Sequence, residues 1–250
     1  MKSIARIFFS VIAVLATVIL FFGCASIQRK LLYFPSHLEL TNELDPWICD
    51  GQIIGYSREV PAPKNIWLML HGNGGQAAHR ASALPSFSRE DSVFILEYPG
   101  YGWRVGTSTM QAINDAARQA YEILRKRFPN HPLCVVGESL GTGPASLLAM
   151  SSLPPDKLIL VVPYDELAKV AGEHYPFLPV RLILHDNWNN VTALSGYRGP
   201  LEIFAETDDG VIPIAHAKAL AATKPQTVFH ELSGGHNDWT HNELVKFQNP

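Results

Sequence analysis

The sequence predicts an α/β fold in which helices cover both faces of a mostly parallel central sheet. Two observations support this prediction. Short apolar runs rich in strand-forming residues alternate with longer stretches whose apolar residues recur at helical spacing. Such alternation is typical of parallel sheets that are buried on both faces. The second observation is a serine between two glycines where one apolar run passes into a helical stretch.

The elements can be assigned in chain order. Seven strands are expected, at residues 52–56, 66–70, 92–96, 133–136, 158–162, 201–205 and 227–232. Residues 110–128 repeat apolar side chains at helical intervals and stop before Pro129, which predicts a helix there. Further helices are expected at residues 142–150 and 239–247. The only room for a lid is at residues 163–197, so the lid must be small.

Composition limits the classes of protein to consider. The chain has 250 residues, 47% of them hydrophobic and 17% charged, which fits one globular α/β domain. The net charge of -3 and the absence of a cluster of Lys and Arg argue against nucleic acid as a partner. The three cysteines show no spacing typical of a zinc site. We therefore expect neither a metal nor an organic cofactor.

Residues 1–28 differ in character from the domain predicted at residues 29–250. A run without any charge extends from residue 7 to residue 28, which predicts a signal peptide or a membrane anchor. The run resembles a bacterial lipoprotein signal that is cleaved and lipidated at Cys24. A retained transmembrane helix of about 20 residues is the alternative, and a buried soluble helix is a third reading. We expect a membrane-anchored protein of the cell envelope whose domain lies outside the cytoplasm.

Ser139 is the candidate nucleophile. It stands between Gly137 and Gly141 in the stretch VVGESLGTGPA, directly after a predicted strand and before a predicted helix. Ligands of parallel sheets bind outside the carboxyl ends of the strands, and this turn lies at such an end. The two glycines allow the close approach of strand and helix that a strained nucleophile turn requires. The alternative is that Ser139 is only a turn residue.

Later strand ends supply the partners that a serine nucleophile needs, namely a base and a third group that orients it. Asp208 and Asp209 follow the strand at residues 201–205, and His236 follows the strand at residues 227–232. The chain order serine, acid, histidine is the order expected of an α/β-hydrolase.

The chain resembles the α/β-hydrolase superfamily, and within it the small BEM46-like and ABHD13/ABHD17-like serine hydrolases. The matching motifs are LYFP at 32–35, HGNG at 71–74, YPGYG at 98–102, GESLG at 137–141, YPFLP at 175–179 and GHND at 235–238. The resemblance implies an α/β-hydrolase fold with a minimal lid, Ser139 as nucleophile and His236 as base.

The resemblance also implies an acid and an oxyanion hole. The family's acid usually lies four residues before a proline, and Pro213 then selects Asp209. Counting from the end of the preceding strand selects Asp208, which we keep as the alternative to Asp209. The backbone N–H groups of Leu140 and Asn73 are the predicted donors to an oxyanion.

Two further histidines have different expected roles. His71, in the HG motif, is expected to brace its loop rather than to act in catalysis. His241 is the alternative to His236 as the base, but it falls inside the predicted C-terminal helix.

The resemblance implies a serine hydrolase that cleaves carboxylic ester or thioester bonds through an acyl-serine intermediate. Peptide or amide hydrolysis on the same triad is the nearest alternative, and a non-catalytic binding protein with this fold is another. The expected substrate is a small-molecule or lipid-like acyl ester. The expected contact with the membrane is the N-terminal segment.

Overall fold

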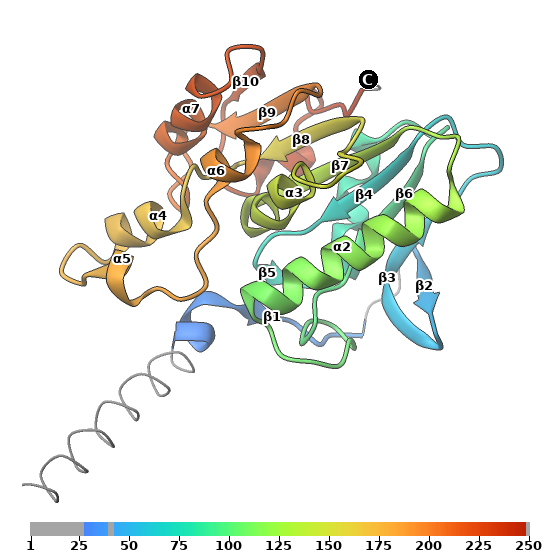
Figure 1. The fold of residues 1–250 in the computed structure, drawn as a ribbon, viewed down its shortest axis with the longest axis horizontal. Coiled ribbons are helices and arrows are strands. Elements are labelled where there is room, and N and C mark those ends of the chain that lie inside the picture. The colour runs from blue at the N-terminus through green and yellow to red at the C-terminus, as the bar shows by residue number, and fades with distance from the viewer. Residues whose placement is uncertain (1–27, 40–42, 249–250) are drawn as a thin grey trace, which may run out of the picture.

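A computed structural model describes residues 28–39 and 43–248, and its centre is an eight-stranded sheet (Figure 1). The strand order is β10-β9-β8-β7-β4-β6-β3-β2. β2 pairs antiparallel with β3, and β3 pairs antiparallel with β6, whereas the other neighbours are parallel. The strands are β2 (Asp45–Cys49), β3 (Gln52–Arg58), β4 (Ile66–Leu70), β6 (Ser92–Leu96), β7 (Leu133–Glu138), β8 (Lys157–Val161), β9 (Leu201–Glu206) and β10 (Val228–Leu232). The predicted α/β fold with a mostly parallel sheet is confirmed.

The helices and a small second sheet surround this centre. The α-helices are α2 (Met110–Arg127), α3 (Thr142–Leu148), α4 (Leu167–His174), α5 (Val180–Ile183), α6 (Asn190–Leu194) and α7 (Ile214–Ala222). The 3₁₀ segments are η1 (Ala77–Ser86), η2 (Ser139–Gly141) and η3 (Asp238–His241). Two short strands, β1 (Phe34–Pro35) and β5 (Gly74–Gly75), pair in parallel with each other. The lid helices α4, α5 and α6 occupy the residues where the sequence left room for a small lid.

The long helix α2 shows why these residues become helical. The Thr109 hydroxyl oxygen accepts the N–H of Ala112 at 3.0 Å and so caps the first turn. Basic side chains in the last turn complement the negative end of the helix dipole. The buried face carries Ile113, Ala116, Ala117, Ala120, Tyr121 and Leu124, at the spacing that the sequence showed.

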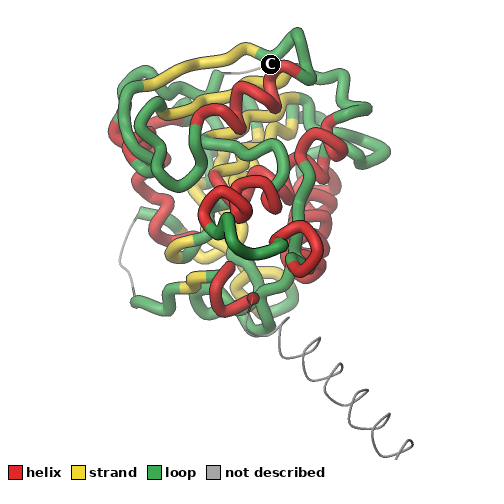
Figure 2. Tube along the Cα trace, turned by 90° about the vertical axis from the view of Figure 1, so that its left-hand side faces the viewer, coloured by secondary structure: helices red, strands yellow, loops and turns green. Residues whose placement is uncertain are grey.

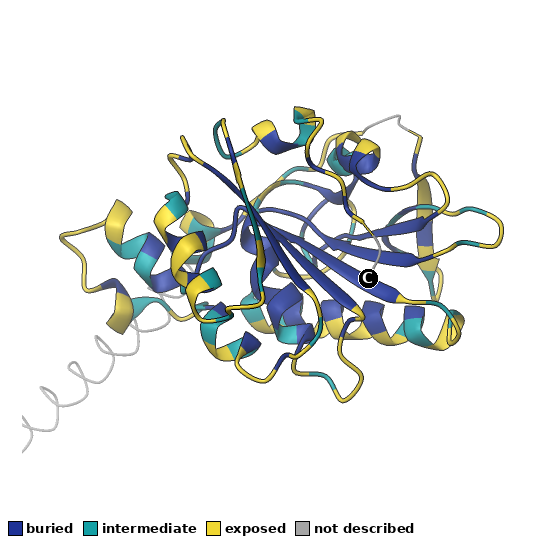
Figure 3. Ribbon diagram, turned by 90° about the horizontal axis from the view of Figure 1, so that it is seen from above, coloured by how far each residue is buried: buried dark blue, intermediate teal, exposed yellow. Residues whose placement is uncertain are grey.

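The central strands β4, β6, β7, β8 and β9 are buried along their whole length (Figure 3), and because alternate side chains of a strand point to opposite sides, both faces of the sheet are covered there. On one face, Leu68 of β4 belongs to a core shared with α2, α3 and α7. On the other face, Trp67 packs with η1 and with Trp239 and Phe247 of the C-terminal segment. Burial on both sides explains why the strands read as continuous apolar runs.

The predicted C-terminal helix at residues 239–247 is wrong. Only η3 is helical there, and the chain then continues to Phe247, whose backbone N–H donates to the carbonyl of Ser86 at 2.8 Å. Val245 and Phe247 are both buried in the same core. Side chains two residues apart share a face only in extended chain, so packing against the sheet excludes a helix.

The lid helices α4 and α5 lie beside the point where the chain enters the described structure at residue 28 (Figures 1 and 2). Within residues 28–39 and 43–248, no helix is long and apolar enough to cross a membrane. Cys24 and all of the predicted anchor except its last residue, Gln28, lie outside these ranges. The signal-peptide, lipoprotein and transmembrane readings therefore stay predictions.

Candidate active site

The turn at Ser139 joins β7 to α3 through η2. Ser139 has a φ of 50°, a left-handed conformation that a residue other than glycine adopts only when its surroundings impose it. A Cβ on Gly137 would lie 2.6 Å from Cβ of Ala145, and a Cβ on Gly141 would lie 2.1 Å from the carbonyl oxygen of Leu70. Both glycines are therefore required by the close approach of β7, α3 and β4.

Three side chains from distant parts of the chain meet at this turn. His236 Nε2 lies 2.8 Å from Ser139 Oγ, and His236 Nδ1 lies 2.7 Å from Asp209 Oδ2. The tautomer that fits these contacts carries its proton on Nδ1 and donates it to Asp209, which leaves Nε2 free to accept the serine proton. The arrangement can therefore deprotonate the Ser139 hydroxyl.

The loop after β9 distinguishes between the two candidate acids. Asp209 is buried, and its Oδ1 accepts the backbone N–H groups of Val211 and Ile212, both at 2.8 Å. Its second oxygen faces the imidazole. The Asp208 side chain is exposed, and its carboxylate instead accepts the hydroxyl proton of Thr207 at 3.1 Å. The structure brings Asp209, and not Asp208, to the histidine.

The two histidines with other expected roles lie as follows. His71 is fully buried, with Nδ1 2.7 Å from the carbonyl oxygen of Gly72 and Nε2 3.2 Å from Glu97. Its own carbonyl accepts the hydroxyl of Tyr98 at 2.8 Å, so His71 braces its loop. His241 ends η3, and the imidazole in contact with Ser139 belongs to His236.

Asn73 lies in the loop between β4 and β5, and its side chain connects this loop to other segments. Its Oδ1 accepts the Tyr101 hydroxyl at 2.8 Å and the backbone N–H of Phe34 at 3.2 Å. Its Nδ2 donates to the carbonyl of Leu32. The predicted partner donor, the N–H of Leu140, lies in η2 directly after Ser139. The N-terminal segment thus helps to fix the loop that carries one of the two predicted donors.

Glu138 connects the nucleophile turn to the same loop. Its carboxylate accepts the N–H of Gly72 at 3.0 Å and Arg80 Nε at 2.6 Å. Burial raises the pKa of this carboxyl, but the charge and hydrogen bond of Arg80, with the Gly72 N–H, outweigh burial, and the pKa is lowered. Glu138 is therefore ionised at neutral pH. Sequence reasoning gave Glu138 and Arg80 no role, and the available signal was a charged residue at the end of an apolar strand.

A third carboxyl, that of Glu206 at the end of β9, is buried beside the acid loop. Neither of its oxygens has a hydrogen-bond partner among the residues that the structure describes. Burial raises the pKa of Glu206, and the charges of Asp238, Asp209 and Asp208 raise it further. Within the described ranges, no group of three or more His, Cys, Asp or Glu side chains is placed to hold a metal ion.

Replacing Glu206 with Gln is expected to stabilise the protein at about pH 8 and to change little at about pH 4. An unfolded Glu loses its proton near its ordinary pKa, whereas the folded carboxyl keeps it to higher pH. The unfolded state then binds fewer protons, so the stability of the unaltered protein falls as pH rises through this window. Glutamine does not ionise and avoids this loss. Thermal unfolding at both pH values measures the effect, and equal shifts at the two would contradict it.

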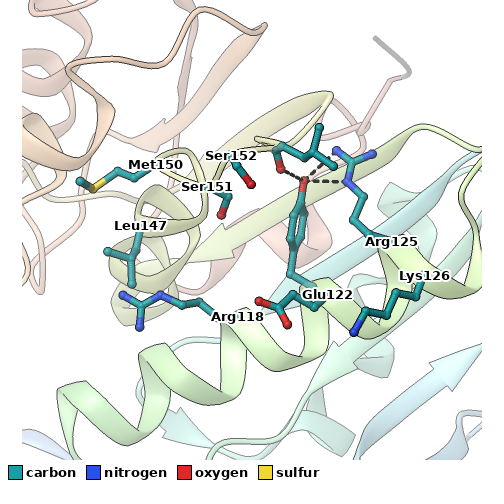
Figure 4. A pocket seen from close by; sticks show the side chains of 10 residues that line it. Arg118, Glu122, Arg125, Lys126, Leu147, Met150, Ser151 and Ser152 are labelled. Carbon is teal, nitrogen blue, oxygen red and sulfur yellow. Dashed lines mark hydrogen bonds between the residues drawn. The ribbon is translucent and has the colours of Figure 1, made fainter.

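A hollow of about 680 Å³ lies between α2 and the segment that joins α3 to β8, and its lining does not include the triad (Figure 4). Arg118, Glu122 and Lys126 point into it from α2. Arg125 also lines the hollow, and its guanidinium donates hydrogen bonds to the Tyr121 hydroxyl. The hollow is therefore separate from the site at Ser139.

The fold and this arrangement define a class: α/β proteins with a serine on a strained turn after a central parallel strand and an acid and a histidine after later strands.

No family model matches the chain. It is 30% identical over 228 residues to the uncharacterized protein MT2364 of Mycobacterium tuberculosis, which covers 84% of this chain and 81% of that protein. It is 27% identical over 191 residues to the lysophosphatidylserine lipase ABHD12 of Danio rerio, which covers 66% of this chain. The chain spans about half of that lipase, 48% of its length.

Among solved structures, the esterase Pf2001 of Pyrococcus furiosus superposes with a TM-score of 0.63 at 12% identity. The superposition covers 82% of this chain and 91% of the esterase, and it shows the fold alone. The chain thus has the α/β-hydrolase fold, and it is similar in sequence to a protein named as a lipase.

Proposed function

We propose that the protein is a serine hydrolase that cleaves carboxylic ester or thioester bonds. The observation that carries the proposal is the chain of two hydrogen bonds from Ser139 through His236 to Asp209, at the carboxyl ends of the parallel strands. We place the chain in the α/β-hydrolase superfamily and, within it, among the BEM46-like and ABHD13/ABHD17-like serine hydrolases, on the motifs quoted above.

The proposed reaction proceeds in two halves. His236 Nε2 takes the proton of Ser139 Oγ as the oxygen attacks the acyl carbon, and Asp209 stabilises the imidazolium that forms. The N–H groups of Leu140 and Asn73 donate to the oxyanion. The imidazolium then protonates the leaving alcohol or thiol, and the acyl group remains on Ser139. Water, deprotonated by His236, releases the acid and restores the hydroxyl.

An acyl ester is the substrate class that we favour. The alternatives are hydrolysis of a peptide or amide and a non-catalytic binding protein. One relative is named a lysophosphatidylserine lipase, which is an ester hydrolase acting on a lipid. We therefore propose a small or lipid-like acyl ester rather than a peptide or amide. The other alternative is a non-catalytic binding protein with the same fold. Such a protein would not need a base next to Ser139, whereas His236 contacts both Ser139 and Asp209 through its two ring nitrogens.

A fluorophosphonate probe tests the proposal directly. The probe is expected to label Ser139, because its hydroxyl lies 2.8 Å from the His236 imidazole nitrogen that can take its proton. Acyl esters of increasing chain length, with thioester and amide analogues, then define the bond and the acyl group. A protein that neither reacts with the probe nor turns over any ester would be the non-catalytic alternative.

The side chain of Asn73 is expected to matter although only its backbone N–H is assigned to the oxyanion. Asn73→Ala keeps that N–H but removes the bonds to Tyr101, Phe34 and Leu32 that hold the loop. We expect kcat to fall by about tenfold to a hundredfold with little change in KM. Tyr101→Phe removes one of these bonds and is the milder control. Steady-state kinetics on a short acyl ester measures both, and wild-type kcat in Asn73→Ala would contradict this role.

We further propose that residues 1–28 hold the protein at the membrane of the cell envelope, with its domain outside the cytoplasm. If Cys24 is lipidated, Cys24→Ser is expected to block acylation and processing and so to change the mature mass. If the segment from Ile7 to Phe22 is instead a retained helix, the same variant keeps mass and membrane fractionation unchanged. Intact-mass measurement of the membrane-extracted protein distinguishes the two, and an unprocessed, unacylated chain rules out the lipoprotein reading.

A further inference from the structure

The lid carries a cluster of apolar side chains that are exposed to solvent. We call the following residues the lid face: Leu31, Tyr175, Phe177, Leu178 and Leu182. Phe177 is 97% exposed and Leu182 is 86% exposed, so these two side chains have almost no contact with the rest of the protein. Single exposed apolar residues are ordinary, but a cluster of this kind is typical of a surface that contacts a partner.

Behind the lid face lies a hollow of about 120 Å³, between the first described residues and the lid. Its lining is almost wholly apolar and includes Leu31, Tyr175 and Leu178 of the lid face as well as Ile183. The lid face and this hollow therefore form one continuous apolar region.

The chain before residue 28 indicates what covers this region. The charge-free run of the sequence ends at Gln28, and the Gln28 side chain is bonded to the lid itself. Its Nε2 donates to the carbonyl of Ile183, and its Oε1 accepts the N–H of His185 at 3.1 Å. A membrane that holds Cys24 or the apolar run would therefore lie near the lid, because Gln28, which is bonded to the lid, follows Cys24 by only four residues.

Two further ties keep the lid at this place. Tyr33 donates its hydroxyl to Asp186 at 2.7 Å, and Arg29 Nε lies 3.9 Å from the same carboxylate. Because Gln28, Arg29 and Tyr33 all contact residues 183–186, the lid cannot turn away from the end of the run without breaking several contacts.

The charges around the lid face suit an anionic surface. Lys30, next to Leu31, and Arg181, next to Leu182, are both exposed. The exposed acid on α4, Glu173, lies 3.2 Å from His216 Nε2 and is thus directed toward α7. Cations beside exposed apolar side chains are typical of protein surfaces that bind anionic lipid.

We propose that the lid face docks on a lipid bilayer. Phe177 and Leu182 enter the boundary between headgroups and acyl chains, and Lys30 and Arg181 contact anionic headgroups. This proposal rests on the proposed membrane anchor and is independent of the chemistry at Ser139. It places the apolar hollow of the lid next to the lipid.

Fluorescence quenching in vesicles tests the docking. The full chain is reconstituted in vesicles of phosphatidylcholine and phosphatidylglycerol whose acyl chains carry bromine. Phe177→Trp adds an indole at the lid face, and we expect the added emission to be quenched at least about twofold. Leu153→Trp is the matched control, because Leu153 is 68% exposed but belongs to the connection between α3 and β8. Its added emission is expected to be unquenched, and equal quenching at the two positions, or none at either, overturns the proposal.

A second measurement separates the docking from the proposed activity. A variant with both Phe177→Ser and Leu182→Ser is expected to hydrolyse a long-chain ester embedded in vesicles about tenfold more slowly, with its rate on a soluble short-chain ester unchanged. If the unaltered protein hydrolyses neither ester, the proposed function fails while quenching still decides the docking. If Phe177→Ser instead dissociates a dimer in detergent, the lid face is an interface between two copies, and the docking is overturned.

Discussion

Ser139→Ala is expected to abolish ester hydrolysis and to leave the fold intact. The hydroxyl is the atom that attacks, so its removal leaves only the rate that binding and the oxyanion donors supply, a loss of about six orders of magnitude in kcat. The turn itself depends on Gly137 and Gly141, whose missing side chains allow the close contacts with α3 and β4. Circular dichroism and thermal unfolding should therefore match the unaltered protein.

Gly141→Ala is the informative counterpart. Its Cβ would lie 2.1 Å from a backbone oxygen of β4, a contact that no side-chain movement relieves. We expect this variant to lose stability and activity together, whereas Ser139→Ala loses activity alone. Turnover retained in a Ser139→Ala preparation free of contaminating esterases would remove Ser139 from the mechanism.

The second large effect is expected at the acid. Asp209→Asn should lower kcat by about 10⁴, because an amide that donates to the imidazole favours the tautomer with its proton on Nε2, which cannot accept a proton from Ser139. Asp208→Asn should change kcat by less than about twofold, since its carboxylate is exposed and contacts Thr207 rather than His236. The pair is closely matched: two adjacent aspartates receive the same substitution.

Initial rates on a soluble ester, with the fraction of reactive sites from fluorophosphonate labelling, compare the two variants. The opposite ranking would move the acid to Asp208 and would mean that the loop after β9 rearranges when substrate binds. Equal losses would mean that both carboxylates help to hold the loop that carries His236. The two loops are already joined by the backbone, because the N–H of Asp208 donates to the carbonyl of Gly234 at 2.9 Å.

Much of the fold can be predicted from the sequence because buried parallel strands leave a strong pattern. The runs at residues 66–70 and 92–96 match β4 and β6 at both ends. The strained turn at Ser139 can also be recognised in the sequence, because positions 137 and 141 accept only glycine. The position of the acid is less certain from sequence alone. Counting back from Pro213 gives Asp209, and counting from the end of the preceding strand gives Asp208. Only the structure shows that the Asp209 side chain is the one that faces His236.

Other parts depend on contacts that have no local pattern. The C-terminal segment is apolar at positions 239, 245 and 247, which alone does not exclude a helix, but packing into the core behind β4 and β9 requires extended chain. The bonds of Glu138 to Gly72 and Arg80 join residues that are 66 and 58 positions apart, respectively. A single sequence does not indicate such pairs, because each partner alone has the appearance of an ordinary charged residue or loop glycine.

The contacts of Gln28 with the lid also bear on how the protein folds. They join residues 155 positions apart, so they cannot form until most of the chain has been synthesised. Closing so long a loop costs entropy, so we expect these contacts to form late in folding. The β-sheet core, whose neighbouring strands are closer in sequence, can assemble before them. Local opening should follow the reverse order: in hydrogen exchange, the amides of residues 28–36 and of the lid are expected to exchange before those of β4 and β7.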